Sequence, residues 1–163
     1  MLYPSAPVSA SSAQFNDWLT SLTDAQVMGV TLLGEARGED TLGRQMVASV
    51  FMTRVKISQA HQARVGAPYW WGMNVREVIL MPWQFSCWNE SDPNRPKLMS
   101  LPEEPLWPEA MFIAESALTG TLPDQANGAT HYLNPLTARP LPTWAISANQ
   151  VAEHLHHTFY RVV

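Results

Sequence analysis

Apolar side chains recur at helical spacing over the first two thirds of the chain. The segment TDAQ at 23–26 has capping-box spacing and opens an apolar run, which predicts a helix that ends near Glu35. A second helix is predicted over 41–57, because its apolar positions fall on one stripe. Arg54 and Lys56 lie near the expected end of this helix, where basic side chains suit its negative pole.

The middle of the chain alternates between loops and short helices. Segment 58–73 mixes Gly, Pro and aromatic residues, which predicts a loop. Asn74 is the expected cap of a short helix, VREVILM, and the proline-rich segment 89–107 is expected to be mostly irregular. Pro108 fits the first turn of a further helix, and Gly120 is expected to close it.

The pattern changes after Gly120, where helical spacing gives way to short β-prone runs. These runs are GATHYLNP, PTWAIS and HTFYRVV, and Pro, Asn and Gly separate them. The sequence therefore predicts an α+β fold, with a helical body and a small antiparallel β-sheet from the C-terminal third. With no internal repeat or linker, residues 21–163 are expected to form a single domain, and residues 1–20 a loose N-terminal arm.

Composition narrows the class of protein. The chain has 163 residues, 46% of them hydrophobic and 15% charged, which is typical of a globular protein. The net charge of −4 and the scattered basic residues argue against a nucleic-acid-binding protein. No apolar run reaches the roughly 18–20 residues that a membrane-spanning helix needs. Cys87 is the only cysteine, which excludes an intramolecular disulfide and a cysteine-based zinc site.

Seven Trp and four Tyr are many for this length. They indicate either a core rich in tryptophan or a cleft with flat aromatic faces that suit sugar rings, and single residues could serve both purposes.

Glu35 is the first candidate for chemistry. It stands where an apolar helix is expected to end, so its backbone leaves a packed interior. Burial against apolar groups raises the pKa of a carboxyl, which is what a general acid needs near neutral pH. Gly34 and Gly38 would let the backbone turn closely and a bulky polymer approach. In the alternative interpretation, Glu35 or Glu39 only pairs with Arg37 or Arg44 on the surface.

Cys87 is the second candidate. SCW at 86–88 matches the last three positions of a thiol-protease signature, but Gln84 and Phe85 stand where that signature has Cys-Gly. His131 or His157 could still partner the thiol in a small Cys–His peptidase. A buried structural cysteine is the simpler interpretation.

The histidines are better explained as residues that line a cleft than as ligands of a metal ion. His154, His156 and His157 are clustered, but the His-Glu-x-x-His order of helical zinc sites is missing, so no metal ligand and no cofactor are predicted. His131 and His157 lie in β-prone runs, in which every second side chain faces the same side. Either could line a cleft as a polar residue.

Six short segments, taken in order, resemble one known family. They are LLGEARGE, QMVASVFMTRV, QFSCW, GATHYLNP, PTWA and HTFYRV, and together they span about residues 25–162. In this order they resemble the SleB/CwlJ-type cell wall hydrolases, which include spore cortex-lytic enzymes and related phage and bacterial domains. The resemblance implies a lysozyme-like or lytic-transglycosylase-like fold. It also implies peptidoglycan as substrate, cut between N-acetylmuramic acid and N-acetylglucosamine. Leu133 departs from the family, which often has a second His there.

The resemblance also implies site residues. The catalytic glutamate of the family's Gly-Glu-Ala-Arg-Gly-Glu motif falls on Glu35. The expected substrate-binding residues are Glu39, Gln84, Phe85, Ser86, Thr130, His131, Tyr132, His157 and Tyr160. A packing role stays open for Phe85 and Tyr132, and a structural one for His157 and Tyr160. We expect a monomer.

The absence of an obvious second acid favours a lytic transglycosylase over a hydrolytic muramidase. A two-carboxylate glycosidase needs a partner acid, and the sequence offers only Glu39 four residues on. Two alternatives of another class remain: a peptidase or amidase that uses Cys87, and a non-catalytic glycan-binding module that uses Trp70 and Trp71.

The N-terminal sequence bears on the setting. The first fourteen residues lack the basic and apolar regions of a signal peptide. We therefore expect a phage or prophage endolysin, made in the host cytoplasm and released to the wall, or an enzyme carried on a phage-like particle.

Overall fold

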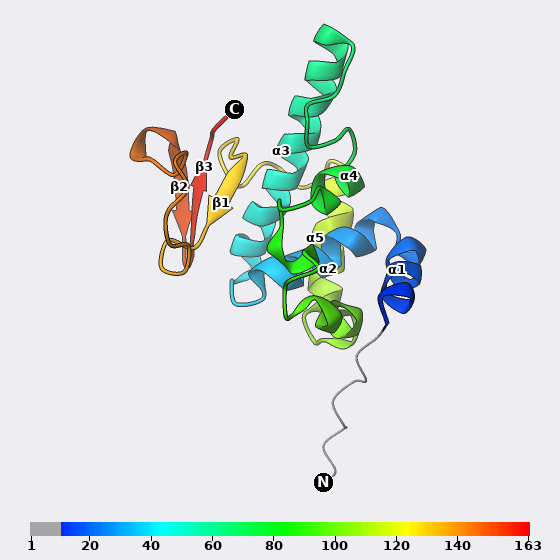
Figure 1. The fold of residues 1–163 in the computed structure, drawn as a ribbon. Coiled ribbons are helices and arrows are strands. Elements are labelled where there is room, and N and C mark those ends of the chain that lie inside the picture. Colours follow the sequence, from blue (N-terminus) through cyan, green and yellow to red (C-terminus); the bar gives the residue numbers. More distant parts are fainter. Residues whose placement is uncertain (1–10) are drawn as a thin grey trace.

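A helical body lies beside a small antiparallel sheet in the computed structural model, which describes residues 11–163 (Figure 1). Helices α2 (Asp24–Ala36), α3 (Thr41–Val65) and α5 (Trp107–Leu118) pack against one another in the body. The sheet comes from the C-terminal third and lies along one side of α3. The predicted α+β architecture is therefore confirmed.

Helix α1 (Ser12–Ser21) corrects the prediction of a loose arm over residues 1–20. Ser11 and Gln14 form a capping box at its start, and Phe15 is buried against the body. The ring of Phe15 contacts Trp88 edge-on, with 6.3 Å between the ring centroids. A short polar helix with one large apolar anchor gives a weak periodic signal, which the sequence pattern did not reveal. Residues 1–10 lie outside the described part of the chain.

The predicted helix starts are confirmed. Thr23 caps α2 through the expected capping box, and α3 begins at Thr41 with Asp40 as its cap. The end of α3 was predicted wrongly, because the helix continues past 57 to Val65 and takes in half of the expected loop. Residues 58–65 contain no Gly or Pro, and the helix stops at Gly66, which has a φ of 77°.

The remaining helices follow their capping signals. Helix α4 (Val75–Leu80) begins after Asn74, whose side chain accepts a hydrogen bond from the backbone N–H of Glu77. Pro108 lies in the first turn of α5, and Gly120 follows its end with a φ of 78°. Between them lie two 3-10 helices, η1 (Ser86–Trp88) and η2 (Arg95–Glu103), within a segment that is otherwise irregular as expected.

The sheet contains β1 (His131–Leu133), β2 (Gln150–His154) and β3 (His157–Tyr160) in the antiparallel order β1-β3-β2. Two of the β-prone runs are strands, but PTWAIS is a turn. In this turn the backbone N–H of Ala145 donates to the carbonyl of Pro142, and the side chain of Asn149 donates to the carbonyl of Trp144. Local hydrogen bonds thus replace the pairing that a strand would need.

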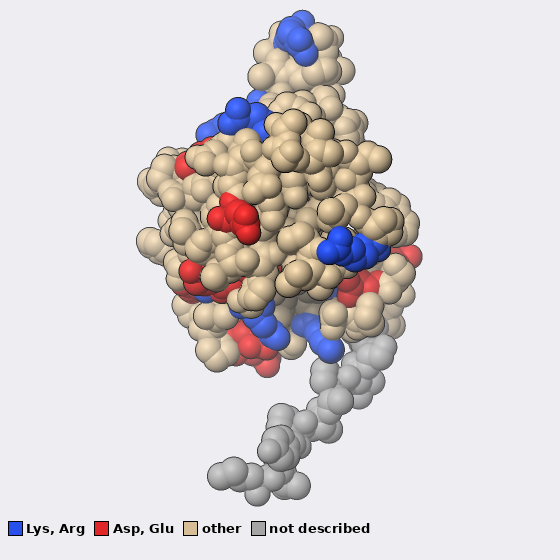
Figure 2. Space-filling view, turned by 90° about the vertical axis from the view of Figure 1, so that its left-hand side faces the viewer, with Lys and Arg blue, Asp and Glu red and all other residues tan. Residues whose placement is uncertain are grey.

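The surface of the described residues gives two further observations. On the face shown in Figure 2, Lys and Arg are few and interspersed with Asp and Glu. No helix within residues 11–163 is long and apolar enough to cross a membrane.

Candidate active site

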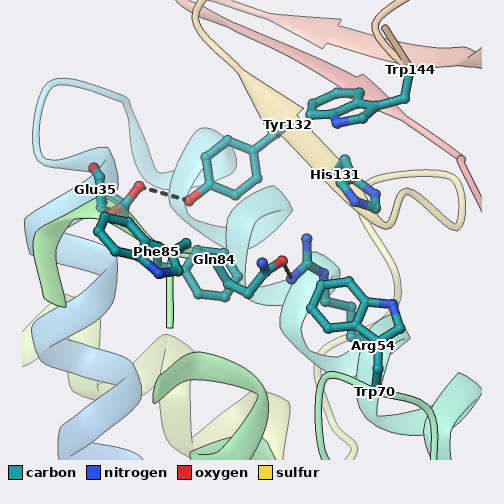
Figure 3. A pocket seen from close by; sticks show the side chains of 10 residues that line it. Glu35, Arg54, Trp70, Gln84, Phe85, His131, Tyr132 and Trp144 are labelled. Carbon is teal, nitrogen blue, oxygen red and sulfur yellow. Dashed lines mark hydrogen bonds between the residues drawn. The ribbon is translucent and has the colours of Figure 1, made fainter. Parts of the chain in front are cut away.

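A pocket of about 480 Å³ opens between the helical body and the sheet (Figure 3). Six segments of the chain form its wall: the end of α2, the middle of α3, the loop with Trp70, the segment that leads into η1, β1, and the turn with Trp144. The predicted residues in the lining are Glu35, Gln84, Phe85, Ser86, His131 and Tyr132. The others are Arg54, Trp70, Trp83 and Trp144.

Glu35 lies in the last turn of α2 and is half-buried. Its Oε1 accepts hydrogen bonds from the backbone N–H of Cys87 at 2.9 Å and from the Ser86 hydroxyl at 3.4 Å. Its Oε2 accepts a hydrogen bond from the Tyr132 hydroxyl at 3.2 Å. An ionised carboxylate at the negative end of a helix is unfavourable, so helix stability does not explain this residue. The three donors hold the carboxyl group at the pocket wall.

The surface ion-pair interpretation of this region is wrong for Glu35. Arg37 pairs with Glu104 at 2.5 Å, and Arg44 pairs with Glu109 at 2.5 Å. Arg37 and Arg44 thus each have an acidic partner from a later part of the chain.

Tyr132 links the carboxyl group to the sheet. Burial, with a smaller contribution from the nearby Glu35, raises the pKa of its hydroxyl well above the ordinary value. The hydroxyl therefore stays protonated and donates to Glu35 (Figure 3). The ring packs against Phe85 and Phe159, with centroids 6.3 and 5.8 Å away. Tyr132 thus combines the packing role and the site role that the sequence left open.

Arg54 holds two walls of the pocket together. Its Nε donates to the carbonyl of Thr130 at 2.7 Å, and its Nη1 donates to the side chain of Gln84 at 3.0 Å (Figure 3). The guanidinium lies over the rings of Trp71 and Phe85, 5.1 Å from each centroid. Burial lowers its pKa to about 10, which leaves it charged at neutral pH. The helix-pole interpretation of Arg54 is wrong, because α3 continues well beyond it.

His131 lies deeper among aromatic side chains. Its ring is 4.8 Å from that of Trp144 and 6.5 Å from that of Trp71, and its Nδ1 is hydrogen-bonded to the Thr130 hydroxyl at 2.9 Å. Burial, aided by the positive charge of Arg54, lowers the pKa of His131 to about 4. At neutral pH the imidazole is therefore uncharged and can donate or accept a hydrogen bond, but it adds no charge to the pocket.

The tryptophans divide between the two roles that the sequence left open. Trp71 is fully buried in the core, and its indole N–H donates to the carbonyl of Arg54. Trp70 and Trp83 are 55% and 76% exposed and line the pocket together with Trp144. The open pocket thus has flat aromatic faces available for a ligand.

Four of the predicted binding residues do not line this pocket. Thr130, His157 and Tyr160 are buried behind it; His157 stacks on Tyr132 at 5.0 Å, and Tyr160 packs on Trp144 at 5.4 Å. The carboxylate of Glu39 is also buried and accepts a hydrogen bond from His156 at 2.8 Å. The assignment of these four residues to substrate binding stays a prediction.

The geometry does not suit the thiol chemistry considered for Cys87. The side chain is buried, and burial together with the negative charge of Glu35 raises the pKa of the thiol, so the reactive thiolate does not form. Nor do the clustered histidines form a shared site, since His154 pairs with Asp40 and His156 with Glu39. Within residues 11–163, no three His, Cys, Asp or Glu side chains are placed to hold a metal ion together.

Four of the residues that line the pocket were not predicted from the sequence as catalytic or substrate-binding residues. Trp70 was considered only for a non-catalytic module, and Arg54, Trp83 and Trp144 were not assigned to the site at all. One local signal existed, because the runs MTRV and PTWA belong to the segments that carried the family resemblance.

Comparisons with known proteins agree with this architecture. Residues 38–160, about three quarters of the chain, match the family described as Cell Wall Hydrolase. Glu35 lies just before the matched span. A comparison with curated proteins found no match.

Among solved structures, the fold is similar to the catalytic domain of the germination-specific lytic transglycosylase SleB from Bacillus anthracis. The TM-score is 0.58 and the identity 24%, over 96% of this chain and 100% of that one. The predicted fold of the lytic transglycosylase type is thereby confirmed. Because the family match covers about three quarters of the chain, the protein belongs to the cell wall hydrolase family, whose activity is the degradation of peptidoglycan.

Proposed function

We propose that the protein is a lytic transglycosylase that cuts the glycan strand between N-acetylmuramic acid and N-acetylglucosamine, with Glu35 as its single acid and base. The observation that carries the proposal is the carboxyl group of Glu35, held by three donors at the wall of an aromatic pocket. Flat indole faces and neutral polar side chains suit a chain of sugars better than a charged ligand.

The acidic residues around the pocket support a mechanism with a single catalytic carboxylate. Glu35 is the only Asp or Glu among the described residues that line it. Glu39 is turned away and is hydrogen-bonded to His156. Retaining and inverting glycosidases place two carboxyl groups within about 5–9.5 Å of each other across the scissile bond. A pocket with one carboxyl group fits a reaction in which the substrate supplies its own nucleophile.

In this reaction Glu35 first donates one proton and later takes one back. Protonated Glu35 gives its proton to the glycosidic oxygen, the bond from that oxygen to the anomeric carbon breaks, and the N-acetylglucosamine hydroxyl leaves. The carboxylate so formed takes the proton of the 6-hydroxyl of the muramoyl residue. The 6-oxygen bonds to the anomeric carbon and leaves a 1,6-anhydro end, which restores protonated Glu35 without water.

Replacement of Glu35 tests the assignment of the acid. We expect Glu35→Gln to keep the fold, because the amide oxygen can still accept the hydrogen bond from the Cys87 N–H and the amide NH2 can donate to the Tyr132 hydroxyl oxygen. Its turbidity-clearing rate on purified sacculi should fall by at least about a thousandfold, since general acid catalysis is lost. Glu153→Gln, an exposed position outside the pocket, is the matched control and should keep full activity. An active Glu35→Gln would contradict the proposal.

Hydrolysis of the same bond is the second candidate reaction, and it requires a further catalytic group. A muramidase needs a group that activates a water molecule on the far side of the sugar. Among the described lining residues, the neutral imidazole of His131 is the group that could accept a proton there. Products that end in reducing muramic acid would favour this candidate.

The biological setting proposed is a phage or prophage endolysin, or an enzyme of a phage-like particle. Its support is the sequence alone, and the start of the chain lies outside the described residues. Cells that express the protein should lyse only when a membrane-permeabilising partner is also present, and this result would support the endolysin. Lysis by the protein alone would argue against it.

A further inference from the structure

A second pocket, of about 600 Å³, lies on the other side of the segment that holds Glu35. Ser86 lines both pockets, and its hydroxyl donates to Glu35. The rest of the second pocket comes from the end of α2 and from η2, including Gly34, Arg37 and Lys97. The carboxyl group of Glu35 thus lies at the boundary between the aromatic pocket and this second pocket.

Close packing at Gly34 keeps the two pockets adjacent. A Cβ at this position would lie 3.0 Å from both Cβ and Sγ of Cys87 and 3.3 Å from Leu98. A Cβ would therefore make the neighbouring side chains shift, and the glycine lets the end of α2 lie directly against η1 and η2. The floor of the second pocket therefore begins within one residue of Glu35.

The second pocket has more charged side chains than the first, where Glu35 and Arg54 are the charged lining residues. Arg37 and Lys97 are exposed at it, and Asp92 and Glu104 complete its charged residues. Arg37 pairs with Glu104, Lys97 donates to the side chain of Asn94 at 3.0 Å, and an Asp92 oxygen accepts the backbone N–H of Asn94 at 2.7 Å. A guanidinium has five N–H donors and an ammonium three, so both cations keep donors for a ligand.

We propose that this second pocket binds the peptide that branches from the muramoyl residue, and that Arg37 and Lys97 recognise its carboxylates. The inference rests on the proposed function, because it requires a muramoyl residue at Glu35. Each such residue carries a lactyl-linked peptide with free carboxylates, and the neutral glycan has no group that needs two cations. With the sugar against Glu35, its branch leaves the aromatic pocket beside Ser86, where the second pocket begins. Charge-assisted hydrogen bonds then select strands that still bear peptides.

Binding to two forms of the same substrate tests the inference. The probes are purified glycan strands with uncrosslinked peptides, and the same strands stripped of their peptides by an amidase. The protein carries Glu35→Gln, so that the strands are not cut during the measurement. The test variant adds Arg37→Gln and Lys97→Gln. The control variant adds Lys56→Gln and Arg64→Gln instead, which remove the same charge at exposed positions outside both pockets.

We expect the test variant to bind peptide-bearing strands about tenfold more weakly and stripped strands within about twofold of its parent. The control variant should match its parent on both, and the difference should shrink as salt is raised. Equal losses on both probes, no loss on either, or no binding by the parent would overturn the inference. If wild-type protein cut neither probe while the peptide-dependent difference remained, the proposed catalysis would fail and the peptide site would stand.

Discussion

At the scale of single residues, the site is made by contacts that no local pattern contains. The donors to Glu35 lie 51, 52 and 97 positions away in the sequence, on η1 and β1. The carboxyl group itself was predictable, because a helix that runs from a packed core into a glycine-flanked turn gives a local signal. Which groups would surround it depended on the packing of the sheet against the helical body.

Tyr132→Phe measures what the hydroxyl does for Glu35. The ring and its packing on Phe85 and Phe159 remain, so we expect the melting temperature to change by no more than a few degrees. Loss of one hydrogen bond to Glu35, the proposed acid, should lower kcat about tenfold and leave KM within about twofold. Tyr69→Phe, outside the pocket, is the matched control. A kcat equal to that of the wild type would show that the contact has no part in catalysis.

The pKa of His131 predicts how stability depends on pH. It is lowered from 6.5 to about 4, so between these values the unfolded chain binds a proton that the folded chain does not. The free energy of unfolding therefore falls as the pH drops from 6.5 to about 4. Above pH 6.5 the imidazole is neutral in both states, and this loss of stability is absent. Because the ring is partly exposed, we expect about 1 kcal/mol from this group.

Urea unfolding at about pH 7 and about pH 4.5 checks this dependence. His131→Gln should lose less stability between the two conditions than the wild type does. His61→Gln, near the end of α3, should lose as much as the wild type. An acid loss that is unchanged in His131→Gln would contradict the account.

Arg54 shows why some site residues were missed. In the sequence it is one basic residue near the expected end of a helix, and only the true end at Val65 makes it a mid-helix residue. Its partners, Gln84 and Thr130, lie 30 and 76 positions away. Exposed aromatics such as Trp83 give no signal that separates a pocket rim from a core, so their roles could not be predicted.

At the scale of elements, the two glycines beside Glu35 have different roles. Gly34 is in contact with Cys87 and Leu98, whereas a Cβ at Gly38 would meet nothing within 4 Å. The sequence predicted the same close approach for both. The starts of α2 and α3 were predictable because capping side chains are local. Helix α1, the end of α3 and the turn at Trp144 were not, since a short polar helix, loop composition and β-propensity are weak signals.

Gly34→Ala and Gly38→Ala form a matched pair. Alanine normally stabilises a helix relative to glycine, but at Gly34 the crowding against Cys87 should outweigh this effect and destabilise the protein by about 1–3 kcal/mol. The same shift moves the Cys87 N–H away from Glu35, so activity should fall as well. Gly38→Ala should be neutral or slightly stabilising. Chemical unfolding and a turbidity assay measure both, and equal effects at the two positions would contradict the account.

At the scale of the whole molecule, α1 is part of the folded unit. Arg76 donates to the carbonyls of Leu19 and Leu22, and the guanidinium of Arg95 lies 3.8 Å from the ring centroid of Phe15. Through Trp88 this packing reaches the η1 segment whose backbone holds Glu35. The helix therefore supports the segment that positions the acid, although it contributes nothing to the pocket lining.

Phe15→Ala tests whether α1 stabilises the whole domain. A buried aromatic ring is lost, so we expect the free energy of unfolding to fall by about 3–4 kcal/mol. Phe112→Ala, at a position that is 69% exposed, is the matched control and should change it by less than about 0.5 kcal/mol. A loss at Phe15 no larger than that at Phe112 would mean that α1 is dispensable.

The form of the product tests the central claim most directly. Purified sacculi are digested with the wild-type protein, and the released muropeptides are analysed by mass spectrometry. The account predicts muramoyl ends in the 1,6-anhydro form, produced by the wild type and by Glu153→Gln but not by Glu35→Gln. Fragments that end only in reducing muramic acid, or anhydro ends that persist in Glu35→Gln, would contradict it.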